Sequence, residues 1–544
     1  MTTSAASEPH GGLPRLTSGT LLASVFACFV AQIGLSIPAV INGYINKDLG
    51  TTSTQLTWVS DAFLVPVTLF ELTFGVVGDL FGRKRLLTTG AGLVVVGGLI
   101  AFLTPSGGVG VLLTGQVIAG VGAAAIFPTS VAMIAAGTHT VRERAHSISI
   151  WAAALTAGGF MSPVIGGVLA RIHHSGSPEA SWRYAFLAMA ILAALSLATT
   201  LALAQNSSAP QGRSLDWPGQ ITIAVALFAL LYAVIQGAED GWASLTVIGG
   251  FVIAVVFLVL FVLVEQRVDK PLLQLDLFAN RMFTISAVVT VLGMFAYLGT
   301  AYDTSIRLSA IQEYTPLKTS IGFVLLNIMG VILFPVSSRM LQRFNPGWVL
   351  AGGMALIGIG DLVLAAIPAT NLSIAAVAVP LLVIGAGFKT AVTAITVVAV
   401  NSVPTQKAGM ASGATSMLRD FGLTLGPAII GAIALTNAAD AIASKVSSSP
   451  SLGSALQQFN ASSKVPPPVK GAVNSGPLGA NAIPNPPNPL KDTAFHALSH
   501  AYSIGYLVCG IAALVAAAIA AVMIGGRQHE HAFVAAPEPE LVVD

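Results

Sequence analysis

The stretch Gly75-Val76-Val77-Gly78-Asp79-Leu80-Phe81-Gly82-Arg83-Lys84-Arg85 lies between two long apolar segments. Its glycines suit a tight turn, because they let backbones approach closely and tolerate positive φ angles. Asp79 can cap a nearby helix, for which Gln406–Gly409 is the candidate, because free N–H groups and the helix dipole favour a carboxylate there. The three cations cannot enter hydrocarbon cheaply, so they hold the turn at the cytoplasmic face of a membrane. A simple positive loop would explain the cations, but not the ordered glycines and the aspartate.

The composition is that of a polytopic membrane protein. Of the 544 residues, 54% are hydrophobic and only 9% are charged. Soluble chains carry about 25% charged residues and could not bury this much apolar surface. The net charge of +2 does not suggest a nucleic-acid partner. Cys28 and Cys509 both lie in apolar segments, so we expect neither a disulfide framework nor a metal site, and no cofactor.

Fourteen segments are long and apolar enough to cross a bilayer, which takes about 20 residues. They are 21–42, 57–78, 86–104, 110–134, 146–170, 183–204, 218–237, 245–265, 283–306, 319–341, 348–368, 373–400, 410–436 and 502–525. If the loops are assigned alternately from a cytoplasmic N-terminus, most Lys and Arg residues fall on the inner side. This asymmetry predicts a multi-pass protein of the cytoplasmic membrane with both termini inside. No small-residue cleavage site follows a short apolar core, so we expect no removed signal peptide.

Two segments are expected to stand apart from the helical core. Residues 437–500 are rich in Pro, Ser, Asn and Gly, which predicts an extended, mobile outer loop. Residues 526–544 are expected to be a disordered cytoplasmic tail. The remaining organisation is predicted to be a cytoplasmic tail (1–20), a six-helix bundle (21–204), a two-helix insertion with linkers (205–282) and a second six-helix bundle (283–525).

An internal repeat relates the two bundles. Ser162–Gly167 in the fifth span, SPVIGG, matches Gly426–Gly431 in the thirteenth, GPAIIG, and Gly158 then pairs with Gly422. A weaker copy of the opening stretch follows the tenth span, at Pro335, Arg339 and Arg343. Such repeats predict two related six-helix halves with an inserted helix pair between them. The fold class is therefore an all-α polytopic membrane protein.

The opening stretch resembles the signature loop between the second and third helices of the major facilitator superfamily, where it forms a cytoplasmic gate. Other stretches resemble the fourteen-helix drug/proton antiporter branch of that superfamily, namely SWRYAF from Ser181, LDWPG from Leu215, EDGW from Glu239 and PLLQLDLF from Pro271. Mycobacterial efflux proteins of that branch end in a helix opened by a stretch like His500-Ala501-Tyr502. The resemblance implies two six-helix bundles with a two-helix insertion, acting as a monomer.

The same resemblance implies a secondary active transporter that exports amphipathic or lipophilic small molecules by alternating access, driven by protons. An uncoupled facilitator, or an exporter of one lipid or metabolite, is an alternative in the same fold. A membrane sensor or assembly partner that does not transport is an alternative of another class, although such a protein would have no need of a gate. Expected partners are the substrate, protons and membrane lipids. No phosphate-binding loop, catalytic triad or metal cluster is present, so an enzyme is not expected.

Small residues and a proline stand in antiporter order in the fifth span. They are Gly158, Gly159, Ser162, Pro163, Gly166 and Gly167. Small residues let a neighbouring helix approach closely, and proline bends the helix. The resemblance associates this motif with export, and a generic packing face is the alternative.

Ionisable residues inside a membrane are costly and become functional candidates. The candidates for proton coupling are Glu71, Asp61 and Asp303. Glu71 shares a helix face with Asp79, and could be a titrating acid or part of the polar network of the gate. Asp61 could instead be a carboxylate at the outer rim. Asp303 could form a structural ion pair with Arg307, four residues later.

The candidates for the substrate cavity are Gln32, Gln116, Lys389, Arg419 and Asp420. Lys389 lies deep in the twelfth span, where snorkelling to an interface is difficult, so it is expected to contact a substrate anion or an acid. Arg419 and Asp420 are adjacent and point about 100° apart on a helix, so each is expected to need a partner elsewhere. The glutamines could bind substrate or serve as polar packing.

Two positions depart from the pattern of the branch. Its first-helix acid is replaced by Gly34, and its fourth-helix arginine, commonly assigned to proton transfer, is replaced by Gln116. Proton coupling is therefore left open, or moves to another acid. The sequence assigns no role to Asp361 and does not identify the substrate.

Overall fold

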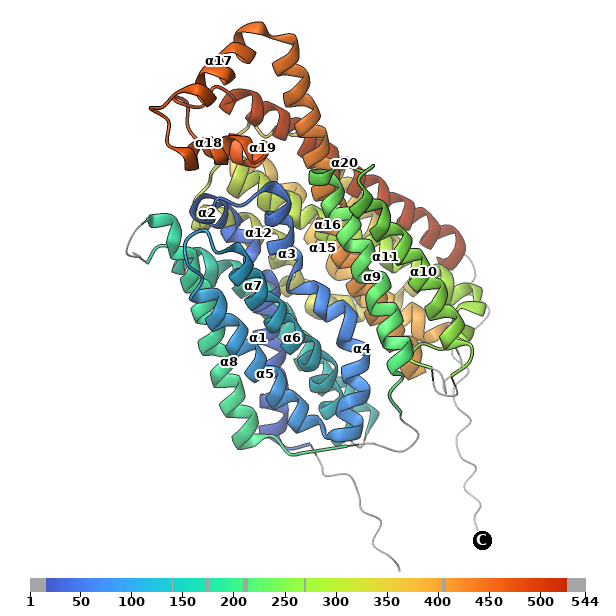
Figure 1. The fold of residues 1–544 in the computed structure, drawn as a ribbon. Helices are drawn as coiled ribbons and strands as arrows, with labels where there is room; N and C mark the ends of the chain where they lie inside the picture. Colours follow the sequence, from blue (N-terminus) through green and yellow to red (C-terminus); the bar gives the residue numbers. More distant parts are fainter. Residues whose placement is uncertain are drawn as a thin grey trace, which may run out of the picture.

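The computed structural model describes residues 16–138, 140–172, 177–208, 214–268, 271–403 and 408–525. Within these ranges every regular element is a helix. Figure 1 shows two bundles of long helices side by side, with a small group of helices projecting from one end. We call that group the cap, and the end of the bundles that carries it the capped end.

The amino-terminal half comprises α1 (Ser18–Ser36), α2 (Pro38–Leu49), α3 (Ser53–Asp61), α4 (Leu64–Phe81), α5 (Arg83–Phe102), α6 (Val109–Gly137), α7 (Val141–Leu169), the short 3₁₀ helix η1 (Pro178–Trp182) and α8 (Arg183–Leu203). The first two spans are each interrupted close to a proline, at Ile37 before Pro38 and at Ala62–Phe63 before Pro66. Proline removes one backbone hydrogen bond and clashes with the preceding turn, so a helix bends or stops there.

The inserted pair comprises α9 (Trp217–Asp240) and α10 (Leu245–Glu265), followed by the 3₁₀ helix η2 (Leu275–Ala279). α9 packs against α3 and α4 of the first half and against α16 of the second. α10 packs on α9, and its apolar residues Val252, Val255 and Val259 are more than half exposed. An apolar helix exposed in this way is suited to contact with lipid.

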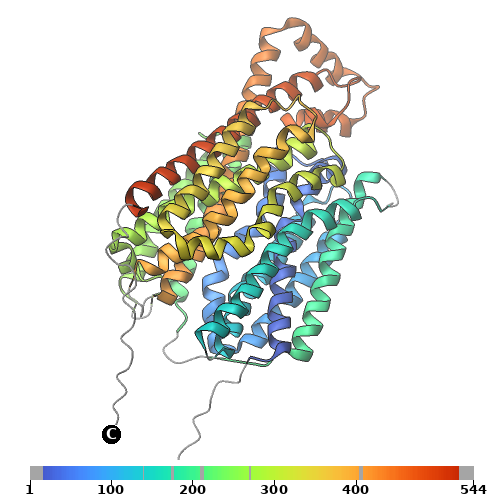
Figure 2. The ribbon, with the colours of Figure 1, turned by 180° about the vertical axis from the view of Figure 1, so that it is seen from behind.

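The carboxy-terminal half comprises α11 (Arg281–Ile306), the π-helical turn η3 (Arg307–Ile311), α12 (Pro316–Ile332), α13 (Phe334–Arg343), α14 (Pro346–Ala366), α15 (Ile374–Asn401), α16 (Ala408–Ser448), α20 (Lys491–Ile519) and the π-helical η5 (Ala520–Gly525). The cap consists of α17 (Pro450–Ala461), α18 (Pro467–Asn474) and α19 (Pro477–Ala482), between the capped ends of α16 and α20. Figure 2 shows the same arrangement from behind, with the long α20 leading back from the cap along the second bundle.

Thirteen helices of the described part of the chain are long and apolar enough to cross a membrane, and each corresponds to a predicted span. The prediction of one continuous tenth span over 319–341 is wrong. α12 has only 17 residues and ends at Ile332, and α13 begins one residue later, with Pro335 in its first turn. Proline lacks the N–H that would continue the ladder of α12, which explains the break.

The prediction of an extended, mobile loop at 437–500 is also wrong. α16 continues to Ser448, and α17, α18 and α19 follow. Each of these three helices has proline in its first turn, where the missing N–H has no intrahelical partner to lose. Buried apolar side chains from the cap and from the start of α20 form a small core, which includes Phe459 and Leu490. The prolines therefore begin helices instead of preventing them.

The cap contacts both halves of the protein. The backbone N–H of Leu478 donates to Ser53 Oγ of α3 at 3.4 Å. Asn481 Nδ2 donates to the carbonyl oxygen of Ala310 in η3 at 2.9 Å. At the start of α20, Lys491 Nζ lies 2.7 Å from Glu313 Oε1, just beyond η3. The cap therefore bridges the two halves across their capped ends.

The internal repeat is visible as equivalent helix contacts. α7 packs against α1, and α16 packs against α11. A Cβ atom at Gly158 of α7 would lie 2.6 Å from the carbonyl oxygen of Phe29 in α1. A Cβ atom at Gly422 of α16 would lie 2.7 Å from the carbonyl oxygen of Val291 in α11. Glycine permits the same close approach in each half.

Removing the carboxylate of Asp48 is expected to destabilise the amino-terminal half. Asp48 Oδ2 accepts hydrogen bonds from Arg183 Nη1 at 2.6 Å and from Trp182 Nε1 at 2.9 Å, and the side chains of Asp48 and Arg183 are each 6% exposed. Asp48→Ala would leave the guanidinium buried without its counterion, a change that costs about 3–5 kcal/mol. Unfolding of the purified protein in detergent should show a clearly lower midpoint. Asp240→Ala, at an exposed position, should not change it, and equal midpoints for the two variants would contradict the expectation.

Candidate functional site

A cavity of about 1370 Å³ lies between the two halves. α1, α4, α6 and α7 line one side, and α11, α12, α15 and α16 line the other. The cavity extends from Asn42 and Ser305 near the capped end to Asp79, Arg83 and the exposed Arg144 at the opposite end. Most of its surface is apolar. The charged residues that line it are Glu71, Asp79, Arg83, Arg144, Asp216, Lys389, Arg419 and Asp420.

Hydrogen bonds between the halves close the cavity on the capped side. Asn42 Nδ2 of α2 donates to Ser305 Oγ of α11 at 3.0 Å, and Ser305 Oγ donates to the carbonyl oxygen of Ala39 at 2.5 Å. Farther toward the cap, α2 meets η3 at Gly43, where a Cβ atom would overlap the backbone carbonyl of Ser309. The backbones of the two halves are thus in contact at the capped end. In this state the cavity extends to the opposite end.

The opening stretch forms the turn between α4 and α5. Gly82 has a φ of +105°, a conformation that favours glycine. Arg83 Nη2 lies 2.6 Å from Asp79 Oδ1, so the aspartate pairs with the first cation of its own stretch. Asn206 and Ser207, just beyond α8, hold the turn: Arg83 N donates to the Ser207 carbonyl and Lys84 N donates to Asn206 Oδ1.

The other gate residues lie around this turn. Gly75 lines the cavity, Gly78 lies beside Thr129 of α6, and Arg85 is exposed. The helix cap predicted for Asp79 involves Gln406–Gly409, of which residues 406 and 407 lie outside the described part of the chain. Its pairing with Arg83 was not anticipated.

The residues of the antiporter motif in α7 face three different surfaces. Gly158, Ser162 and Gly166 face α1 and α2, and Ser162 Oγ donates to the carbonyl oxygen of Ile33 at 2.9 Å. Gly167 faces α12, where a Cβ atom would lie 2.8 Å from Ser320 Oγ. Gly159 and Pro163 line the cavity. The motif of this one helix therefore packs within the first half, contacts the second half and forms part of the cavity wall.

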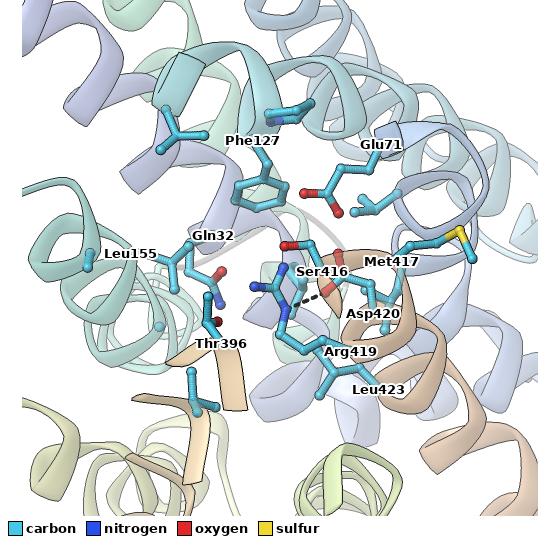
Figure 3. A pocket seen from close by; sticks show the side chains of 18 of the residues that line it. Gln32, Glu71, Phe127, Leu155, Thr396, Ser416, Met417, Arg419, Asp420 and Leu423 are labelled. Carbon is cyan, nitrogen blue, oxygen red and sulfur yellow. Dashed lines mark hydrogen bonds and ion pairs between the residues drawn. The ribbon is translucent and has the colours of Figure 1, made fainter. Parts of the chain in front are cut away.

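Three charged side chains from the two halves meet in the middle of the cavity (Figure 3). Arg419 Nε lies 2.8 Å from Asp420 Oδ1. Glu71 extends from α4 toward them, within electrostatic reach of both, although its Oε2 has no hydrogen-bond partner in the described part of the chain. The expectation that Arg419 and Asp420 could not face each other is wrong, because the long arginine side chain bends back to its neighbour. We call these three residues the central cluster.

Polar and aromatic residues complete the cavity wall. Thr68 Oγ1 of α4 bonds to Thr424 Oγ1 of α16 at 2.7 Å, one turn from the central cluster. Lys389 of α15 lines the cavity beside Phe388, whose ring stacks on that of Tyr297 with centroids 3.5 Å apart. Gln32 of α1 also lines the cavity, on the side of α7 (Figure 3).

Three predicted site residues lie outside the cavity lining. Gln116 is buried and donates through Nε2 to the carbonyl oxygen of Val59 at 3.2 Å, a contact that fits polar packing. Asp61 is fully buried at the end of α3, so it is not an exposed carboxylate. Asp303 is fully buried as well.

The expected ion pair between Asp303 and Arg307 is not formed within the described residues. The guanidinium of Arg307 instead donates through Nη2 to the carbonyl oxygen of Pro368 at 3.0 Å. Arg307 is the last residue in register with Asp303, because its backbone N–H still donates to the Asp303 carbonyl, and its side chain turns toward Pro368 instead.

Sequence reasoning missed two features near the site. Asp361, which had no assigned role, is fully buried in α14 and accepts a hydrogen bond from Thr300 Oγ1 of α11 at 2.7 Å. An acid inside an apolar helix was the available signal. Trp151 and Phe127, which line the cavity, carry no comparable signal, because aromatic residues are common in membrane helices.

Residues 22–427 match the family model described as Major Facilitator Superfamily. The chain belongs to this superfamily. It is 30% identical over 414 residues to the multidrug resistance protein Stp of Mycobacterium tuberculosis, covering 76% of this chain and 75% of that protein. It is 24% identical to the tetracenomycin C resistance and export protein of Streptomyces glaucescens, covering 95% of this chain and 93% of that protein. The chain is therefore a multi-pass membrane transporter and not an enzyme, and the predicted resemblance to mycobacterial efflux proteins is confirmed.

Solved structures agree on the fold. A bacterial homologue of the human lysosomal transporter Spinster, in an inward-facing and unoccupied conformation, has a TM-score of 0.59 at 16% identity, covering 95% of this chain and 97% of that one. A POT family transporter in complex with 5-aminolevulinic acid has a TM-score of 0.60 at 12% identity, covering 93% and 97%. The predicted all-α fold of the superfamily is confirmed, and at these identities the likeness extends to the fold alone.

Proposed function

We propose that this transporter exports amphipathic or lipophilic small molecules across the cytoplasmic membrane by alternating access, driven by protons that move inward. The capped end is assigned to the outside, because Arg83, Lys84 and Arg85 lie at the opposite end. The cavity then opens to the cytoplasm, where an exporter collects its substrate. The relatives named for multidrug resistance and for tetracenomycin C export support this direction.

The observation that carries the proposal is the central cluster in the apolar cavity. Glu71 belongs to the first half, whereas Arg419 and Asp420 belong to the second. Two carboxylates and one guanidinium sum to one negative charge, and uncompensated charge away from water is costly. Binding one proton neutralises the cluster and weakens the attraction between Glu71 and Arg419. Proton binding and release can therefore favour different relative positions of the halves.

The cavity wall suits substrates with a large apolar surface. A volume of about 1370 Å³ exceeds the usual range for a drug-sized ligand, which is about 300–1,000 Å³. Stacked Tyr297 and Phe388 offer a flat apolar surface, and Lys389 lies next to them. An amphiphile could place its ring system on the aromatic pair and its polar end toward the charged side chains.

Transport by the purified protein in proteoliposomes, with and without an imposed pH gradient, tests the proposal. We expect a fluorescent lipophilic drug to accumulate against its concentration gradient only when the pH gradient is present. Equilibration of the drug without any response to the gradient would favour an uncoupled facilitator. A structural observation supports that second candidate: a Cβ atom at Gly34 would lie 2.8 Å from the Phe63 ring, so no acid fits where the branch usually carries one.

Lys389→Ala is expected to distinguish acidic from cationic cargo. If Lys389 contacts an acidic group of the substrate, its loss should weaken binding of an acidic amphiphile by about tenfold or more, since a hydrogen bond to a charged group contributes about 1.5–3 kcal/mol. A cationic probe of matched lipophilicity should bind as before. Binding to the purified protein would be measured for both probes, with the exposed Lys318→Ala as the control. Equal losses for the two probes would indicate a structural lysine.

A further inference from the structure

A second group of charged residues lies inside the carboxy-terminal half. Asp303 of α11 and Asp361 of α14 are both fully buried, and neither lines the central cavity. Asp303 is within electrostatic reach of both Asp361 and Arg307, and Arg307 is itself only 2% exposed. We call Asp303, Asp361 and Arg307 the capped-side cluster, because it lies in the half of the membrane nearer the cap.

The carboxylates of this cluster are incompletely satisfied. Thr300 Oγ1 donates to Asp361 Oδ1 at 2.7 Å, but Asp361 Oδ2 has no hydrogen-bond partner among the described residues. The backbone of Tyr506 approaches the Asp303 carboxylate, but neither oxygen of that carboxylate receives a hydrogen bond of standard geometry from these residues. A buried carboxylate with so few donors is costly when it is ionised.

The helices around the cluster provide space for the two carboxylates. Within the described ranges, they contribute no second cationic side chain. At Gly505 of α20, a Cβ atom would overlap the carboxylate of Asp303. The ionisable side chains that face the cluster come from α20, and they are Tyr502, Tyr506 and Cys509. Asp61 of α3 lies near Tyr302. α16, on the remaining side, presents Gly426 and Ile430 to α11.

Two carboxylates and one guanidinium leave one uncompensated negative charge, and neither acid lines the central cavity. A single buried charge of this kind costs several kcal/mol. One proton would remove it. A metal cation would instead need several oxygen ligands, and it would meet the guanidinium of Arg307. The described residues also contain no group of three or more His, Cys, Asp or Glu side chains able to hold a metal ion.

A chain of hydroxyl groups joins this cluster to the contact between the halves. Tyr302, next to Asp303, lines the central cavity, and its hydroxyl lies 2.8 Å from Thr57 Oγ1 of α3. Tyr502 interacts with Tyr302 on one side and with Asp303 on the other. The bond between Tyr302 and Thr57 spans the two halves, so it must break when they separate at the capped end. Water from the capped side would then reach the hydroxyl of Tyr302, which is buried against Thr57 in the state seen here, and through it the acids.

We propose that Asp303 and Asp361 form a second proton-binding site, which is loaded from the capped side when the halves separate there and is sealed in the state seen here. It extends the proton-driven export proposed above, on which its role in transport rests. The central cluster would then release its proton toward the cytoplasm, whereas the capped-side cluster would take its proton from outside. Closing the contact between Thr57 and Tyr302 separates the bound proton from the outer water.

The test is infrared spectroscopy of the purified full-length protein at neutral pH. A protonated carboxylic acid has a C=O stretching band separate from those of carboxylates. The difference spectrum of wild type minus Asp303→Asn should contain this band, and so should that of wild type minus Asp361→Asn. Both are expected because removing either acid leaves one carboxylate to balance the positive charge of Arg307, so that no proton is needed. Asp240→Asn, at an exposed position, should give no such band. Absence of the band from both difference spectra would overturn the proposal.

Tyr302→Phe tests the proposed path of the proton separately from the proton-binding site itself. This variant should retain the band but exchange its proton for deuterium more slowly, because one hydroxyl of the chain is removed. Unchanged exchange would rule out this route. In proteoliposomes, accumulation driven by a pH gradient should be lost in both asparagine variants, whereas substrate binding should be retained. If wild type itself shows no such accumulation, the proposed function fails, and the infrared bands still decide whether the second site binds a proton.

Discussion

Valine at position 43 is expected to hold the two halves apart at the capped end. A Cβ atom there would overlap the backbone carbonyl of Ser309, and neither backbone can move without displacing its helix. Overpacking of this kind costs about 1–3 kcal/mol, and each 1.4 kcal/mol changes a population ratio about tenfold. Gly43→Val should therefore shift the transporter strongly toward the state that is open at the capped end.

Distances between spin labels would measure this shift. A pair at the exposed positions Arg171 and Asn371, which lie at the capped ends of the two halves, should move apart. A pair at the exposed Arg85 and Arg339, at the opposite end, should move closer. Gly92→Val is the matched control, because a Cβ atom at Gly92 of α5 meets nothing within 4 Å. Unchanged distances in Gly43→Val would mean that the closed contact adapts to an added side chain.

Glu71→Gln is expected to abolish transport driven by a pH gradient. Glutamine has nearly the same shape as protonated glutamate but cannot release a proton. The central cluster would then stay neutral throughout, with Arg419 and Asp420 paired to each other. Substrate binding should be little affected, since the apolar walls and Lys389 remain. Accumulation in proteoliposomes under an imposed pH gradient would be compared with binding to the purified protein.

Two further measurements make the result specific. Exchange of labelled for unlabelled substrate without a gradient should continue in Glu71→Gln, because that process needs no net proton movement. Glu239→Gln, at an exposed acid in the last turn of α9, should transport like the wild type. Full accumulation by Glu71→Gln would assign coupling to other acids, with the capped-side cluster as the next candidate.

Most membrane spans could be predicted from the sequence, because crossing a bilayer demands long apolar runs whatever their neighbours are. The failures involve proline. Pro335 divides the tenth span, although its surroundings are apolar. In the cap, Pro450, Pro467 and Pro477 were interpreted as signs of an extended chain, yet each stands at the start of a helix. A proline disfavours helix in the residues before it but can begin a helix itself. The composition of a segment does not show on which side of a proline a helix lies.

The candidate site was less predictable than the fold. Ionisable residues in apolar segments could be named from the sequence, among them Glu71 and Lys389, which line the cavity. Which of them meet depends on the packing of helices distant in the chain. Glu71 lies near Asp420 because α4 contacts α16, and Asp361 lies near Asp303 because the turn of α20 at Gly505 leaves space. Spacing along a single helix predicted an ion pair between Asp303 and Arg307, but the guanidinium donates to the carbonyl oxygen of Pro368 instead.

The shortness of α12 gives the surrounding lipid a part in transport. At a rise of about 1.5 Å per residue, its 17 residues span about 26 Å, less than the hydrocarbon thickness of about 30 Å. α12 packs against α7 of the other half, so the mismatch falls on the seam where the halves move against each other. The bilayer must thin beside that seam, or the helix must tilt, at a cost of fractions of a kcal/mol per Å. The length of the acyl chains around the protein therefore enters the energy balance between its two states.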